Sequence, residues 1–135
     1  MKHVLTALLA VFGVAFAAAP AATDLLPAGT WNLATVNGEL PTWENVEIFL
    51  TVGTGGAQVN GKAGCNNFTG RASEVAENVV TFGNLAATMM FCPGDGSDAE
   101  RFFFDLFATN LTVLHAGNEL TLFNDDTTVT YALAE

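Results

Sequence analysis

Apolar and polar residues alternate over much of the chain from Trp31 onwards, a pattern typical of β-strands that are buried on one face. Runs of this kind are expected to form strands at 31–36, 46–52, 71–75, 78–82, 111–115, 119–123 and 127–133, whereas residues 57–64 are expected to contain a turn. Asn37-Gly38 and Asn60-Gly61 are dipeptides typical of tight hairpin turns, and a further hairpin is expected around Ala76-Glu77. Short polar segments join the last three runs, which predicts an antiparallel meander at the end of the chain.

One segment repeats apolar residues at helical spacing instead. Its apolar positions, three and four residues apart, are Ala99, Phe102, Phe103, Leu106 and Phe107. Ser97 and Glu100 have the spacing of a capping box, so Ser97 is expected to cap the N-terminus of this helix. Phe104 falls outside the apolar stripe and is expected to be exposed or at an interface. The stripe itself should pack on the open end or face of the sheet.

The start of the chain has the pattern of an export signal. An apolar run from Val4 to Phe16 precedes small residues, which predicts a signal peptide at residues 1–17 that is cleaved after Ala17, with Ala19 and Ala22 as alternative sites. The run is shorter than the roughly 20 residues of a membrane span, although a retained N-terminal anchor is the alternative. No cysteine for lipidation lies nearby. We therefore expect a soluble exported protein, periplasmic or secreted, with no membrane span after signal removal.

The rest of the chain is expected to form a flexible lead-in, residues 18–27, and one compact domain, residues 28–135. After signal removal, Lys62, Arg71 and Arg101 face 14 acidic residues, a net charge of −11. This charge argues against nucleic acid and against anionic membrane surfaces as partners. A monomer is expected.

Candidate chemistry is sparse. Cys65 and Cys92 are the only cysteines, and in an oxidising compartment they are predicted to form a disulfide. If they were reduced, they could bind a metal ion together with His115 and a carboxylate, but their spacing matches no zinc module. Ser73 or acidic residues with His115 offer an alternative function, that of a secreted hydrolase. Because no nucleophile motif such as Gly-x-Ser-x-Gly supports it, a non-catalytic protein without cofactor or metal is favoured.

The segment around the first cysteine has two interpretations. Gly64 and Gly70 permit unusual backbone angles or close chain approach, and Phe68 can anchor the segment in the core. Asn66 and Asn67 can then bond to nearby main chain and fix an irregular crossing. The alternative makes these two asparagines a polar recognition pair.

Several motifs, taken together, resemble a known family. They are Trp31–Leu33, Gly64–Gly70 (GCNNFTG), Leu85–Pro93 (LAATMMFCP), Glu100–Leu106 and Glu119–Leu122. In this order and spacing they resemble the META domain, also called HslJ-like, over residues 28–134. Two positions depart from the family pattern: Met89 stands where many members carry Arg or Lys, and Phe91 stands where a small residue is common.

The resemblance implies an α+β fold, a small antiparallel sheet curled into a partly open β-barrel with one helix packed on it. It also implies an exported or envelope-associated bacterial protein, since the family is linked to the heat-shock response and to novobiocin resistance. Related domains occur in a parasite virulence protein. The family has no established catalytic residue, which agrees with a non-enzymatic function, and its two cysteines match Cys65 and Cys92.

The predicted function is therefore binding of a protein or a small apolar ligand in envelope stress tolerance. Met89, Met90, Phe91 and Phe104 form the candidate binding surface, because alternation along a strand at 89–91 would place some of these side chains outside the core. In the alternative, the run belongs to a sheet that is buried on both faces.

Overall fold

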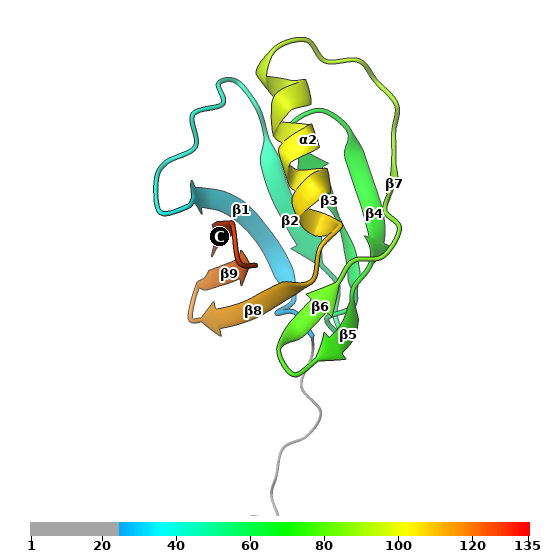
Figure 1. Ribbon diagram of the computed structural model, residues 1–135, viewed down its shortest axis with the longest axis vertical. Helices are drawn as coiled ribbons and strands as arrows, with labels where there is room; N and C mark the ends of the chain where they lie inside the picture. The colour runs from blue at the N-terminus through cyan, green and yellow to red at the C-terminus, as the bar shows by residue number, and fades with distance from the viewer. Residues whose placement is uncertain (1–24) are drawn as a thin grey trace, which may run out of the picture.

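The computed structural model describes residues 25–135, so the predicted signal peptide and its cleavage sites lie outside the described residues (Figure 1). The strands are β1 (Gly29–Val36), β2 (Ile48–Val52), β3 (Gln58–Ala63), β4 (Asn67–Arg71), β5 (Ser73–Ala76), β6 (Val79–Thr81), β7 (Ala86–Ala87), β8 (Leu111–Ala116), β9 (Glu119–Phe123) and β10 (Thr128–Leu133). In this part of the chain they accompany one helix, α2 (Asp95–Phe107). No helix within residues 25–135 is long and apolar enough to cross a membrane.

The strands form one antiparallel sheet in the order β5-β6-β8-β9-β10-β1-β2-β3-β4-β7. The sheet curls into a half-barrel, and α2 lies in front of β2 and β3 in Figure 1. This architecture confirms the predicted α+β fold. The predicted meander is also confirmed, since β8, β9 and β10 pair in sequence. Strand β1 lies between β10 and β2, and so joins the meander to the first half of the chain.

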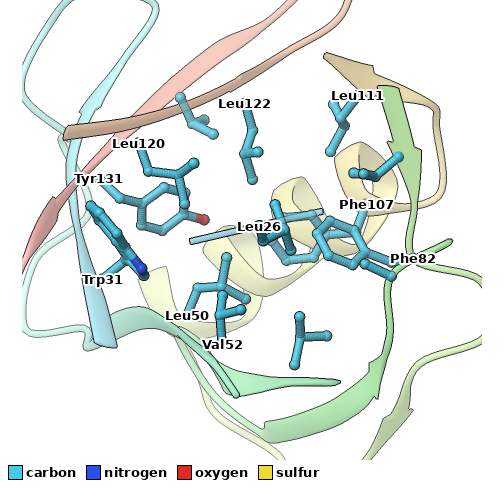
Figure 2. Packing of buried hydrophobic residues seen from close by; sticks show 14 of the residues in the cluster. Leu26, Trp31, Leu50, Val52, Phe82, Phe107, Leu111, Leu120, Leu122 and Tyr131 are labelled. Carbon is cyan, nitrogen blue, oxygen red and sulfur yellow. The ribbon is translucent and has the colours of Figure 1, made fainter. Parts of the chain in front are cut away.

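One hydrophobic core lies between the curled sheet and the helix. Its members include Trp31, Leu50, Val59, Phe68, Phe82, Leu120, Leu122, Val129 and Tyr131 from the sheet side, and Phe103, Leu106 and Phe107 from α2. The predicted apolar helix stripe is therefore confirmed as a packing face. Figure 2 shows Tyr131 among the buried side chains, and this burial raises the pKa of its phenol well above the ordinary value.

Leu26 also belongs to this core. Its side chain is fully buried, and Figure 2 shows it among the core side chains. Its backbone N–H donates to Gly56 O at 3.2 Å, and the next residue, Pro27, accepts a hydrogen bond from Trp31 Nε1 at 3.0 Å. The flexible lead-in expected for residues 18–27 is therefore wrong for its last residues, because Leu26 fills space inside the half-barrel. Residues 18–24 lie outside the described range.

The Asn60-Gly61 dipeptide is not a turn. Both residues lie inside β3, where Gly61 pairs with Leu50 on one side and with Phe68 on the other. A Cβ atom at Gly61 would lie 2.2 Å from Phe49 O, so glycine is needed here for close approach of neighbouring strands. The hairpin prediction failed because this requirement comes from tertiary neighbours and has no local signal.

The other predicted turns form with shifts. Asn37 and Gly38 have positive φ angles of 52° and 83° and close a bridge between Val36 and Glu39, but the next strand begins only at Ile48. The hairpin expected around Ala76-Glu77 joins β5 and β6, with its left-handed residue one position later at Asn78. Polar turn residues thus located both bends correctly.

The predicted capping box does not form. Helix α2 begins at Asp95, two residues before Ser97, and its N-cap is Gly94 without a side-chain cap. The positive φ of 71° at Gly94 explains a glycine there. Ser97 and Glu100 bind other partners, described below.

Gly61→Ala is expected to lower the free energy of unfolding by about 3 kcal/mol, because the added methyl group overlaps the Phe49 carbonyl. Gly53→Ala is the matched control, since a Cβ there meets Gln58 at an ordinary contact distance of 3.5 Å. Urea unfolding of both variants measures the difference. Equal stability of the two variants would contradict the packing argument.

Candidate functional site

The two cysteine motifs meet at the N-terminal end of α2. Cys65 and Cys92 form a disulfide with a Cα–Cα distance of 5.8 Å, which confirms the predicted pairing. The bond is consistent with an exported protein. It also removes the two thiolates on which the alternative metal site would have depended. Among residues 25–135, no group of three or more His, Cys, Asp and Glu side chains could hold a metal ion.

Asn66, beside the disulfide, is buried and fully bonded. Its Oδ1 accepts hydrogen bonds from the Met90 N–H at 2.6 Å and from Thr88 Oγ1 at 2.9 Å. Its Nδ2 donates to Met90 O and to Glu100 Oε2, both at 3.2 Å, and its backbone N–H donates to Glu100 Oε1 at 2.7 Å. The first interpretation of this residue, a buried asparagine bonded to main chain, is therefore confirmed in part: its side chain makes two bonds to the Met90 backbone and two to the side chains of Thr88 and Glu100. Asn67 is exposed in β4.

The first turns of α2 hold both cysteine motifs. Ser97 Oγ donates to Cys92 O, and the Glu100 carboxylate accepts the two hydrogen bonds from Asn66. A Cβ atom at Gly64 would lie 2.8 Å from Ala99 Cβ, so the chain before Cys65 passes directly against the helix. Ser97 and Glu100, which were predicted to cap the helix, instead bond it to the segments that contain Cys92 and Asn66.

The connection between β7 and α2 begins with a segment that we call the Met loop, residues 88–92; Figure 1 shows this connection arching over the N-terminal end of the helix. The exposed fraction is 94% for Met89, 55% for Met90 and 85% for Phe91. Exposure of these side chains agrees with the prediction and excludes a sheet buried on both faces. Residues 89–91 do not form the strand on which the alternation argument depended, because the Asn66 side chain binds the Met90 N–H and C=O that a strand partner would need.

Phe104 does not join this surface. It is half-buried and packs edge-on against Phe68, with ring centroids 5.9 Å apart. It lines a shallow cavity of about 240 Å³ with Leu85 and Phe107, and no Met loop residue contributes to the lining of that cavity. The fourth member of the predicted surface is thus separate from the other three.

A second feature beside the disulfide was not singled out from the sequence. An open cleft of about 460 Å³ is lined by Glu44, Asn45, Val46, Gly64, Cys92, Pro93, Asp95 and Gly96. The Glu44 N–H donates to Asp95 Oδ2 at 2.7 Å, which fixes the loop before β2 against the start of α2. These residues are 51 positions apart in the sequence, so no local pattern could have indicated the cleft.

The residues of the hydrolase alternative are not brought together. Ser73 lies on the edge strand β5, two strands away from His115 on β8, and the strand register offsets the two residues by about five positions, or about 16 Å along the strand direction. His115 is exposed, stacks edge-on with Trp31 and shares a hydrogen bond of 2.9 Å with Gly117 O through Nε2. No ion pair within residues 25–135 joins it to a carboxylate.

A profile of the META domain family matches residues 24–135 of this sequence. The chain therefore belongs to the META domain family. An NMR structure with 25% sequence identity superposes with a TM-score of 0.63, covering 80% of this chain and 91% of the other. The NMR structure of a protein from Burkholderia xenovorans, 21% identical, gives a TM-score of 0.64 over 86% of this chain and 93% of the other, which shows a shared fold. A comparison with curated proteins finds no match.

Reduction of the disulfide is expected to lower the free energy of unfolding by about 3.5 kcal/mol, because it releases a loop between cysteines that are 27 positions apart. Urea unfolding with and without a thiol reductant measures the loss. The intact mass of the unreduced protein should be lower than that of the reduced chain by two hydrogens. Free thiols in the purified protein would contradict the bond.

Asn66→Asp is expected to lower the free energy of unfolding by about 3 kcal/mol at pH 7, because a carboxylate oxygen then faces Met90 O and the Glu100 carboxylate. The same repulsion raises the pKa of the introduced carboxyl in the folded protein above its ordinary value, so the loss should shrink as the pH falls and disappear near the ordinary Asp pKa of about 4. Asn67→Asp adds the same charge at an exposed neighbour and serves as the control. Equal unfolding curves for the two variants would argue against the role of the Asn66 amide.

Proposed function

We propose that this META domain is a non-catalytic exported binding module and that the Met loop is its ligand-contacting surface. The observation that carries the proposal is the exposure of Met89 and Phe91 on a loop whose backbone is held by Asn66 and the disulfide. Its ligand is a protein or a small apolar molecule.

The energetics of the loop favour binding over a purely structural role. Each large apolar side chain that stays in water forgoes about 1.5–3 kcal/mol of burial energy, so three consecutive exposed ones are costly unless a ligand covers them. Methionine adapts its shape to different apolar partners. Because the Met90 backbone is already held by Asn66, the loop loses little backbone freedom when it binds.

The compartment and the physiological role belong to the same proposal. The predicted signal peptide and the disulfide support export, to the periplasm or the medium. Membership of the META domain family supports a role in envelope stress tolerance, since the resemblance implies a link to heat shock and to novobiocin resistance.

Substitution of serine at both Met89 and Phe91 is expected to change the free energy of unfolding by less than about 1 kcal/mol, because both side chains are exposed. The variant should nevertheless fail to restore the growth of a deletion strain under heat or novobiocin. A photoreactive residue at position 89 should form one defined adduct in cells of the native host, identified by mass spectrometry.

The matched control replaces Val75 of β5 and Leu114 of β8, which are 49% and 54% exposed, with serine. It should restore growth like the unmodified protein, and a photoreactive residue at position 75 should give no adduct. Full rescue by the Met loop variant, together with no adduct at position 89, would overturn the proposal.

A further inference from the structure

The domain that carries the Met loop is strongly acidic. All but one of the 14 acidic residues lie within residues 25–135, against three basic residues. Two of these three cations are already paired, Lys62 with Glu47 at 3.7 Å and Arg101 with Asp98 at 3.5 Å. The domain therefore presents a large excess of negative charge to any partner that approaches.

Part of this charge lies directly beside the Met loop. Glu44 and Asp95 both line the open cleft of about 460 Å³, and so does Cys92, the last residue of the loop. Since Phe91 immediately precedes Cys92, the exposed apolar residues are next in the chain to a residue that lines the cleft with its two carboxylates. The hydrogen bond from the Glu44 N–H to Asp95 Oδ2 and the disulfide hold the two sides of the cleft in place.

We propose that this surface docks a basic amphipathic segment of a partner protein, an inference that rests on the proposed function and names its partner class. The apolar face of the segment packs on Met89 and Phe91, and a lysine or arginine side chain enters the cleft beside Glu44 and Asp95. A segment of this kind matches both the apolar and the charged half of the surface. The adaptable methionines accommodate partners that differ in detail.

Charge also favours a basic segment over two alternative ligands of this surface, a second copy of the chain and an uncharged apolar molecule. A second copy of the chain would bring the same acidic cleft and the same excess of carboxylates to the interface, and like charges at close range oppose association. An uncharged apolar molecule would cover the Met loop but bring no positive charge to Glu44 and Asp95. A basic amphipathic segment matches both the apolar Met loop and the negative charge of the cleft.

The test uses three synthetic peptides and calorimetric titration of the mature protein. A Leu/Lys peptide presents an apolar and a basic face, a Leu/Gln peptide keeps the apolar face without charge, and a Ser/Lys peptide keeps the charge without the apolar face. The Leu/Lys peptide should bind at least about tenfold more tightly than either of the others. Its affinity should fall severalfold when the ionic strength rises from about 0.05 M to about 0.5 M.

Two pairs of variants locate the site. The Met89→Ser/Phe91→Ser variant, and separately Glu44→Gln/Asp95→Asn, should each weaken Leu/Lys binding about tenfold. The control Glu119→Gln/Asp125→Asn makes the same charge change at exposed positions of β9 and the turn after it, and should change the affinity less than twofold. Thermal unfolding checks that each variant is folded.

The outcomes separate this inference from the proposed function. Equal affinity for the Leu/Lys and Leu/Gln peptides, both lost in the Met loop variant, would overturn the basic partner but keep the binding surface. Equal weakening by the two carboxylate variants would show that the net charge acts without the cleft, and would overturn the docking site. Absence of binding by the Leu/Lys peptide would overturn the inference, while photocrosslinking from position 89 would still decide the proposed function.

Discussion

Five hydrogen bonds converge on the buried residue Asn66, and they join three segments that are far apart in the sequence: the start of β4, the Met loop and the first turns of α2. Each of the groups involved would cost about 1–3 kcal/mol if it were buried without a partner, so the three segments are stable only in this mutual arrangement. The adjacent disulfide joins two of the same segments covalently. The position of the exposed Met89 and Phe91 side chains therefore follows from a buried polar contact, although neither side chain takes part in it.

The half-barrel supplies the frame for this contact. Strand β1 pairs with β10 on one side and β2 on the other, so the two ends of the domain are held in one sheet. Helix α2 packs Phe103 and Phe107 into the core on the concave face of the sheet. This packing fixes the position of the helix relative to β3. In this position the helix places Glu100 where it accepts a hydrogen bond from Asn66, and Ser97 where it donates one to Cys92 O.

Local patterns predicted those parts of the fold that depend on neighbours in the sequence. The strands after Leu111 alternate and are joined by short turns, and they form as expected. Gly61 looked like a turn residue because the sequence does not show that its strand neighbours approach too closely for a side chain. Ser97 and Glu100 matched a capping box, but they bind partners 5 and 34 positions away. The two-residue strand β7 carried no pattern at all.

In the candidate site, too, some features could be predicted from the sequence and others arise only from tertiary contacts. The cysteine pair followed from composition and compartment, and the resemblance to the META domain placed both motifs in one family. Exposure of the Met loop was expected from strand alternation, whereas the structure produces it by bonding the loop backbone to Asn66. The cleft could not be predicted, because Glu44 and Asp95 come together only through tertiary packing.

A curled sheet that does not close retains two free edges, and free edges invite pairing between molecules. Here both edges are blunted. At one end β5 is exposed throughout, carries Glu74 and is interrupted by an irregularity in its register with β6. At the other end β7 stops after two residues, because Asn66 occupies the backbone groups of Met90 that would extend it. The residue that fixes the Met loop thus also shortens the edge strand, which limits edge-to-edge pairing of sheets from different molecules.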